Sequence, residues 1–292
     1  MRITNGILSR QATTGFQAQM RALDEARRQA TSGLRVERPS DDPVANAGIM
    51  EASSSLRALE QYKRNLQVGQ SRLAIEDSTL EQVGNVLARG KELALSQASD
   101  TASAQTRLAA QQELNKLVDF VTDLGNAKLA GAYVFGGQYA DSAPFTGTVH
   151  DPARPPSGAM MLEIGPGLFV EANHDAQEIF IDTDAVDALK ALSSALGAND
   201  TTAITTAMGR VDAAFQNTQE LVGELGARMN QMDVTISNLD TLEVTLQTFR
   251  SELSDADIAE AVTNLVNRQG SLEAAMLANS RILNLTLTDY LR

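Results

Sequence analysis

The C-terminal segment reads SDADIAEAVTNLVNRQGSLEAAMLANSRILNLTLTDYLR (residues 254–292). Its apolar residues recur at spacings of three, four and seven, which is typical of one face of an α-helix. This apolar row consists of Ile258, Val262, Leu265, Leu272, Met276, Leu283 and Tyr290. Ser254 followed by Asp257 predicts a reciprocal cap at the start of the helix. We therefore predict one long terminal helix with a narrow apolar stripe.

Two polar residues, Gln269 and Asn279, lie on the same face as the stripe. They suit a coiled-coil seam, where isolated polar residues set register and partner number, better than a globular core. The stripe is also thin for the length of the segment, so its burial does not offset the entropy lost when the backbone is ordered. We expect this helix to become ordered only against a partner helix or many copies of itself.

Composition favours rods over large globular cores, because only 4% of the 292 residues are aromatic and none is Trp. The net charge of −13 argues against nucleic acid as the main partner, although seven arginines give residues 1–40 a net charge of +4. The absence of cysteine excludes disulfide and thiol chemistry. No cofactor is implied by any of these features.

No apolar run is long enough to span a bilayer, so we predict no membrane insertion. Residues 1–15 lack the apolar core and the small-residue cleavage site of a secretory signal. If the protein leaves the cell, we expect it to do so by another route.

All seven prolines lie in residues 39–43 and 144–166, which leaves the rest of the chain free to be helical. Residues 5–31 predict an N-terminal helix that could pair with the terminal helix and that ends at Gly33 as a C-terminal cap. Its weak apolar face includes Ile7, Phe16, Met20 and Leu23. Asp42 as N-cap and Pro43 as first residue predict the start of the next helix.

Five leucines at an unbroken spacing of seven predict a coiled-coil seam in a helix from 43 to about 98. They are Leu59, Leu66, Leu73, Leu80 and Leu87. A shorter helix follows a polar break at 99–103 and is marked by Leu108, Leu114, Leu117, Val121 and Leu124. A return helix at 203–250 matches the first in length, so we predict an antiparallel bundle of about three helices.

Residues 132–184 differ from the rest, because they hold half of the aromatic residues and five of the seven prolines. Alternating apolar residues predict strands at 132–135, 160–164, 168–171 and 178–182, and a helical pattern resumes at 185–197. The predicted fold is mainly α: a long antiparallel coiled-coil-like bundle with paired terminal helices and a small β-rich insert. The predicted domains are 1–42 with 251–292, 43–131 with 185–250, and the insert 132–184.

The linker TSGLRVERPSDDP (residues 31–43) closely resembles the one that follows the first helix in the flagellin superfamily. The form Pro-Ser-Asp-Asp-Pro is similar to the hook-associated protein 3 branch, the hook-filament junction proteins, whereas flagellins usually have Asp-Asp-Ala-Ala there. The motif places Gly33, Arg35, Pro39, Asp41, Asp42 and Pro43 in the linker and its caps. GAYVFGG (131–137) with Pro144-Phe145, GARMN (226–230) and DYLR (289–292) agree, so the resemblance covers residues 1 to about 145 and 200–292.

The resemblance implies an extracellular axial component of the bacterial flagellum, exported through the hollow growing structure without a cleaved signal. In that family the terminal helices form a central tube and the insert faces outward. The implied partners are other copies of the chain, hook-associated protein 1, flagellin, the filament cap and an export chaperone that shields the terminal helix. We therefore predict a junction protein without catalysis, which assembles through the stripe, Gln269, Asn279 and the apolar face of residues 5–31.

Other functions are less well supported by the residues. Asp41 and Asp42 could serve acid–base chemistry or hold a metal, but a turn followed by a helix cap explains both. His150 and His174 lack the spacing of metal ligands, so we predict surface residues and no metal site. No nucleophile elbow or phosphate loop is present. The basic residues Arg2, Arg10, Arg21, Arg27 and Arg28 favour pairing with neighbouring subunits over a nucleic-acid or membrane arm.

Three rivals stay open. The first is a short filament flagellin, which shares the terminal helices. The second is a cytoplasmic coiled-coil adaptor or chemosensory rod, although such a protein would hardly combine an aromatic insert with unpartnered termini. The third is an enzyme hidden in the insert, which a substrate-sized pocket lined by His150 or His174 would favour.

Overall fold

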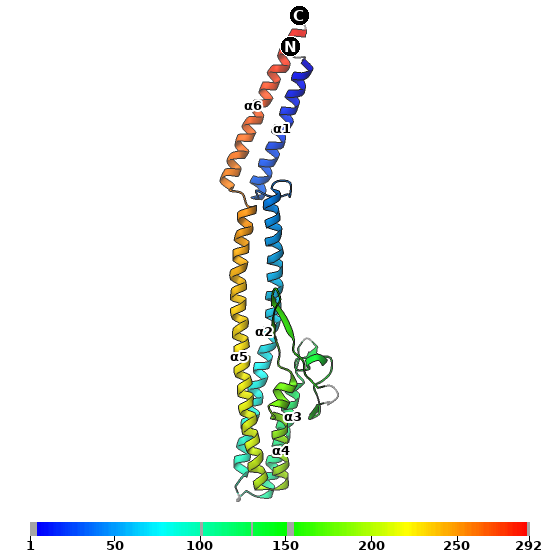
Figure 1. The fold of residues 1–292 in the computed structure, drawn as a ribbon, viewed down its shortest axis with the longest axis vertical. Helices are drawn as coiled ribbons and strands as arrows, with labels where there is room; N and C mark the ends of the chain where they lie inside the picture. Colours follow the sequence, from blue (N-terminus) through cyan, green and yellow to red (C-terminus); the bar gives the residue numbers. More distant parts are fainter. Residues whose placement is uncertain (1–4, 100–101, 130, 151–154, 291–292) are drawn as a thin grey trace. The chain divides into compact units, whose positions relative to one another are not determined.

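The computed structural model describes residues 5–99, 102–129, 131–150 and 155–290. Within these residues most of the chain lies in six α-helices, which confirms the prediction of a mainly α fold (Figure 1). The chain divides into two compact units, a terminal unit, Met1–Ala58 with Leu242–Arg292, and a central unit, Leu59–Thr241. Helices α2 (Pro43–Gln97) and α5 (Thr201–Ser254) each contribute residues to both units. The division into three domains stays a prediction.

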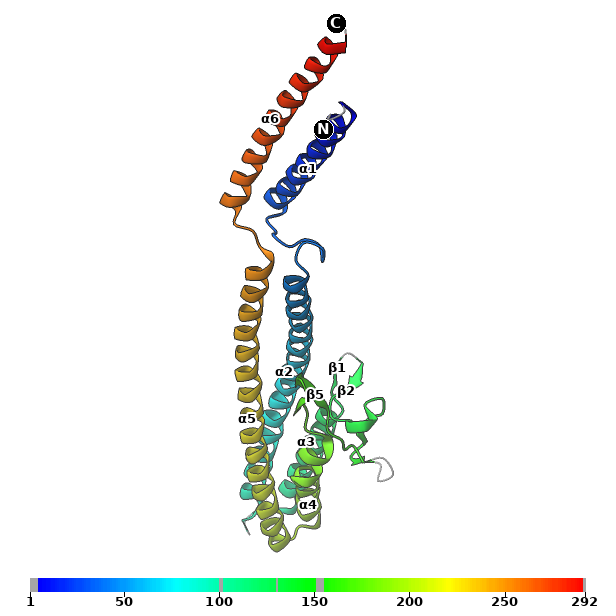
Figure 2. The ribbon, with the colours of Figure 1, turned by 45° about the horizontal axis from the view of Figure 1, so that its top comes forward.

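The terminal unit pairs α1 (Asn5–Ser32) with α6 (Ile258–Tyr290), which run antiparallel side by side (Figures 1 and 2). The side of α1 that faces α6 alternates steps of four and three residues, which is the spacing of a helix–helix seam. This seam consists of Ala12, Phe16, Gln19, Leu23, Ala26 and Ala30, and Ala261, Leu265, Leu272 and Ala275 form its counterpart on α6. The small alanines let the two helix backbones approach each other closely.

The start of the terminal helix differs from the prediction. Ser254 is the last residue of α5, and its carbonyl accepts hydrogen bonds from the backbone N–H groups of Arg35 and Val36. Helix α6 begins at Ile258 with Asp257 as its N-cap, because Asp257 Oδ1 accepts from the N–H groups of Ala259 (2.8 Å) and Glu260 (3.3 Å). The predicted reciprocal cap between Ser254 and Asp257 is therefore wrong.

The central unit contains parts of α2 and α5 together with α3 (Ala104–Gly125) and α4 (Ala185–Ala198). The five leucines at a spacing of seven on α2 are all buried, and four of them are 0% exposed. Helix α4 packs on α3, so the described part of this unit has four helices, where a bundle of about three was predicted. The fourth is the segment at 185–197, which was predicted to be helical and whose leucines are fully buried.

Helix α3 carries a buried arginine that its leucines did not indicate. Leu108 is 49% exposed, whereas Arg107 is 4% exposed. The Arg107 guanidinium donates to the carbonyls of Gln97 (3.1 Å) and Ser99 (3.0 Å) and to Asn199 Oδ1 (2.5 Å). These acceptors lie at or just beyond the ends of α2 and α4, so Arg107 ties the ends of both helices to α3.

The insert is built from three antiparallel hairpins and not from one sheet. They are β1 (Lys128–Leu129) with β2 (Ala132–Tyr133), β3 (Phe145–Thr146) with β4 (Val149–His150), and β5 (Met161–Gly165) with β6 (Leu168–Glu171). A three-residue helical turn, η1, spans Gly137–Tyr139. Of the predicted strands, the one at 178–182 is wrong, because Gln177–Asp182 forms a π-helix, η2. Its adjacent residues Ile179 and Phe180 are both fully buried, whereas a strand with one solvent-facing side would bury only one of them.

Aromatic rings join the insert to α3. Phe180 packs edge-to-face against Phe135 and Phe145, with ring centroids 5.7 and 5.6 Å apart. Gly125 at the end of α3 makes room for this cluster, since a Cβ there would lie 2.6 Å from the Phe145 ring. The insert is thus fixed to the helices by a small aromatic core.

Candidate assembly surface

The predicted stripe on α6 is only partly covered by α1. Leu265 and Leu272 are half-buried in the α1–α6 seam. Ile258, Val262 and Met276 are 53%, 46% and 46% exposed, and Gln269 is also exposed. The side chains of Asn279, Leu283 and Tyr290 lie outside the described residues. The structure therefore divides the stripe into a flank that contacts α1 and a flank that faces solvent.

The solvent-facing flank is wider than the sequence predicted. Val266 and Leu277, which lie next to the predicted row at helical spacing, are 60% and 66% exposed. Together with Ile258, Val262 and Met276 they form two exposed apolar groups, separated by the exposed Gln269, which we call the open flank of α6. Single exposed apolar residues are ordinary, whereas several on one face of a helix favour a surface that binds another molecule.

Helix α1 has a seam side and an outer side. Phe16 and Leu23, both predicted for assembly, are half-buried towards α6, whereas Ile7 and Met20 are 43% and 47% exposed. The seam also holds Gln19, whose Oε1 is buried without a hydrogen-bond partner and which the sequence prediction missed. Like Gln269, it is a polar residue at a helix-packing position, where it can restrict register.

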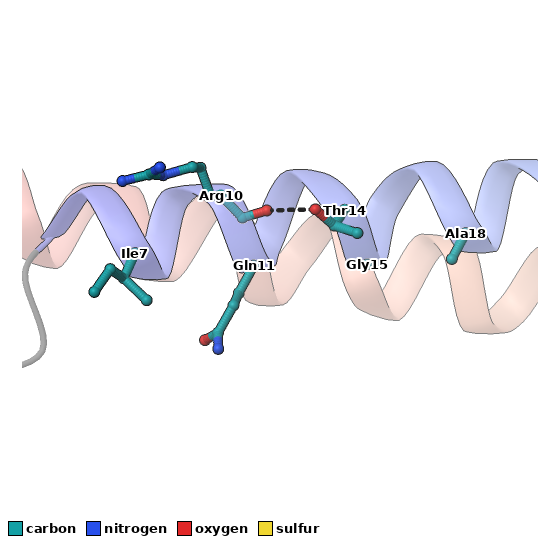
Figure 3. Close-up of a pocket in the computed structure, with 6 residues that line it drawn as sticks. All are labelled: Ile7, Arg10, Gln11, Thr14, Gly15 and Ala18. Atoms are coloured by element: carbon teal, nitrogen blue, oxygen red, sulfur yellow. Dashed lines mark hydrogen bonds between the residues drawn. The ribbon is translucent and has the colours of Figure 1, made fainter.

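A hollow lies on the outer side of α1, where small residues leave the backbone uncovered (Figure 3). Its lining includes Thr14, Gly15 and Ala18, flanked by Ile7, Arg10 and Gln11. Figure 3 shows Ile7 and Gln11 extending to one side of the helix and Arg10 to the other. Thr14 Oγ1 donates to the Arg10 carbonyl (2.8 Å), so its hydroxyl is satisfied within the helix. An open surface of this shape can accept larger side chains of a neighbouring helix.

Two chain segments meet where the terminal helices join α2 and α5. The Gly33 backbone has a φ of 71°, which favours glycine at the end of a helix, and the Gly33 carbonyl accepts from the Ala256 N–H (2.8 Å). Leu34 and Asp255 form an isolated antiparallel bridge. The Arg35 guanidinium donates to the Leu253 carbonyl (2.7 Å) at the end of α5 and to Asp42 Oδ2 (3.2 Å). We call this arrangement the joint.

The two linker carboxylates have separate tasks in the joint. Asp42 is the N-cap of α2, since its Oδ1 accepts from the N–H groups of Val44 (3.1 Å) and Ala45 (3.0 Å), and Pro43 is the first helical residue. Asp41 Oδ2 accepts from the N–H groups of Glu37 (3.2 Å) and Arg38 (2.9 Å), which closes the turn that contains the exposed Pro39. Both side chains thus hold the backbone of the linker.

The hydrogen bond from Ala45 N–H, followed by that from Arg35, lowers the pKa of Asp42 below its ordinary value. A carboxyl with a lowered folded-state pKa stabilises the fold above its unfolded pKa, and this contribution is lost as pH falls through the folded-state pKa. We expect Asp42→Asn to lower the free energy of unfolding at neutral pH and to change it little in strong acid. Denaturant unfolding of both chains over a pH series measures this, and a difference that does not shrink in acid would contradict it.

His174 is not the surface residue that the sequence predicted. Its side chain is 1% exposed and lies against Glu76 of α2, which is 0% exposed. His150 lies in β4, and its side chain is outside the described residues. Within the described parts of the chain, no group of three His, Asp or Glu residues is placed to hold a metal ion. No described helix is long and apolar enough to cross a membrane.

Comparison with known proteins points to one family. Residues 3–140 match the bacterial flagellin N-terminal helical region, and residues 208–291 match the bacterial flagellin C-terminal helical region. A flagellin of Halalkalibacterium halodurans is 27% identical over 264 residues, which cover 88% of this chain and 87% of that protein. Flagellar hook-associated protein 3 of Salmonella typhimurium is 23% identical over 308 residues, with coverage of 94% and 95%.

The fold is also similar to solved structures. A flagellar hook-associated protein of Vibrio parahaemolyticus superposes with a TM-score of 0.67 at 20% identity, over 74% of this chain and 100% of that one. The two matched flagellin regions contain α1 and α6, and they leave most of the insert and α4 between them. The chain belongs to the bacterial flagellin family and is a structural protein of the flagellum.

Proposed function

We propose that this protein is a junction component of the flagellum, which joins the hook-associated ring to the flagellin filament by helix–helix assembly. The observation that carries the proposal is the open flank of α6, whose apolar residues the α1 partner within the same chain leaves exposed. A surface of this kind needs partners from other molecules, since isolated helices gain most of their stability from packing. Rings or helical arrays of identical chains supply such partners repeatedly.

Two features favour a junction protein. The linker Pro39-Ser40-Asp41-Asp42-Pro43 resembles that of hook-associated protein 3, and Pro43 together with the Asp42 cap fixes the start of α2. The Salmonella hook-associated protein 3 also aligns with this chain over nearly the whole length of both. The proposed partners are further copies of the chain, hook-associated protein 1, flagellin and the filament cap. An export chaperone would cover the terminal helix before secretion through the flagellar channel.

In this assembly the terminal helices, in the domain proposed as 1–42 with 251–292, would form the inner tube. The side chains of Leu265, Leu272, Met276 and Leu283 would supply packing, and Gln269 and Asn279 would set register. The helical rod would form the next shell, with the insert facing outward. The open flank of α6 and the hollow on α1, which face solvent in the single chain, would be the surfaces that contact neighbouring copies.

A filament flagellin is the second candidate, because a Halalkalibacterium flagellin is 27% identical over most of both chains. Addition of purified protein to filament seeds distinguishes the two. We expect a junction protein to add a limited layer and then to block elongation by flagellin, whereas a flagellin would extend the seeds indefinitely. Electron microscopy of filament length over time measures this, and continuous growth would overturn the junction role while leaving the assembly surface intact.

A further inference from the structure

The central unit contains a pocket of about 300 Å³ between η2 and α5 that the assembly role does not use. Four carboxylates line it, two from η2 (Glu178 and Asp182) and two from α5 (Glu220 and Glu224), and His174 also contributes. No Lys or Arg is among its lining residues in the described part of the chain. A pocket with this lining presents hydrogen-bond acceptors and negative charge.

His174 has a buried ring nitrogen without a hydrogen-bond partner in the described part of the chain. Its backbone N–H donates to Glu76 Oε2 (3.1 Å), and its ring Nδ1 lies 3.2 Å from the same oxygen. A carboxylate oxygen accepts, so the ring tautomer with its proton on Nδ1 fits this contact, and in that tautomer Nε2 is an acceptor. Nε2 is buried and has no hydrogen-bond partner among the described residues. It lies 3.9 Å from Glu224 Oε1, which is beyond hydrogen-bond distance.

The cations near the pocket are already engaged. Arg228 donates to Glu224 (2.7 Å) and to the Asn173 carbonyl (3.1 Å), and it pairs with Glu171 (3.3 Å). Burial, and to a smaller extent the charge of Asp175, raises the pKa of Glu178. A positive charge placed in the pocket would favour the ionised form of this carboxyl. The pocket therefore lacks a donor that could serve His174, Glu178 and Glu224 together.

We propose that this pocket binds an organic cation of the guanidinium or primary-ammonium class, with N–H donors shared between His174 Nε2 and the carboxylates of Glu224 and Glu178. A planar guanidinium carries five N–H donors in a fixed fork, which suits acceptors spread over two helices. A directly coordinated metal ion fits less well, because no described group of three His, Asp or Glu residues is close enough to hold one. The same chemistry is present in small alkylguanidinium compounds and in an arginine side chain of a second copy of this chain.

The probe for the test is ethylguanidinium, with the neutral isostere ethylurea as its control. The full-length protein is labelled with ¹⁵N-histidine, and the His174 ring resonances are followed during titration. We expect a saturable shift of Nε2 with ethylguanidinium and none with ethylurea. Equal shifts with both compounds, or no saturable shift with ethylguanidinium, would overturn the proposal.

A pair of matched variants tests the lining residues. Glu224 is half-exposed, so Glu224→Gln should fold normally, and we expect it to weaken ethylguanidinium binding at least tenfold. Glu81→Gln removes the same charge from an exposed position on α2 that does not line the pocket, and we expect unchanged affinity. Unchanged binding in Glu224→Gln would exclude the proposed site.

Dilution of the unliganded protein identifies the source of the cation. If an arginine of a second copy occupies the pocket, the His174 Nε2 resonance shifts with protein concentration and ethylguanidinium competes with that shift. If the source is a small molecule, the resonance is independent of protein concentration and responds only to the added compound. Both results support the site. If the pocket binds no cation, the proposed junction role still stands, because α6 contributes no residue to the pocket.

Discussion

Val266→Asp is expected to abolish incorporation of this protein into flagellar assemblies while leaving the isolated chain folded. Val266 is 60% exposed on the open flank of α6, so a carboxylate there stays in water as long as the chain is alone. In an assembled tube the same carboxylate would be buried without a partner, which costs several kcal/mol per copy. Because each copy meets several neighbours, the penalty repeats along the array.

Asn267→Asp is the control, since it adds the same charge to an exposed residue of α6 outside the open flank. We expect this variant to be incorporated normally. Cosedimentation with sheared flagella measures incorporation, and circular dichroism of the purified monomers checks the fold. Normal incorporation of Val266→Asp would mean that the open flank is not an assembly surface.

Leu272→Asp should also prevent incorporation, but for an additional reason. Leu272 is half-buried in the α1–α6 seam, so the carboxylate would weaken the pairing of the terminal helices within one chain. We expect lower helical content in the monomer, with the central unit still folded. Comparison of the Val266→Asp and Leu272→Asp monomers thus separates intramolecular pairing from assembly.

Glu76→Ala is expected to destabilise the central unit by about 2 kcal/mol, because it leaves the buried His174 backbone N–H without its acceptor. Glu76 Oε2 is the acceptor for the His174 backbone N–H, and both side chains are almost inaccessible to solvent. Glu76→Gln keeps an uncharged acceptor in place, so we expect a smaller loss.

The matched control is Asp77→Ala, which removes a carboxylate from the next residue of α2, at an exposed position. We expect this change to alter stability by no more than about 0.5 kcal/mol. Urea unfolding followed by circular dichroism measures all three variants. Equal stability of the Glu76→Ala and Asp77→Ala chains would show that the buried pair contributes little.

The helices could be predicted because their signals are local. The leucine spacing of seven indicates α2 without reference to any other segment, and the two proline windows mark where helices must stop. The cap of α6 could not be assigned in this way, because Ser254 and Asp257 are both good N-cap residues. What distinguishes them is that the Ser254 carbonyl accepts from Arg35 and Val36, more than 200 residues earlier in the chain.

The surfaces of the molecule were harder to predict than its helices. Val266 and Leu277 lie just beside the predicted row, and only the packing of α1 shows which part of α6 stays open. His174 had no informative neighbours in sequence, since Glu76, its buried partner, is 98 residues away. Arg107 was likewise hidden, because arginine is usually exposed and its acceptors come from two segments, 97–99 and Asn199, about 100 residues apart in the chain.

The joint has a mechanical consequence for a protein of a rotating organelle. Two chain crossings, tied by three main-chain hydrogen bonds between residues 33–36 and 254–256, connect the terminal helix pair to the ends of α2 and α5. Because the two segments are fastened to each other, neither backbone can rotate about its own bonds at this point without breaking these hydrogen bonds.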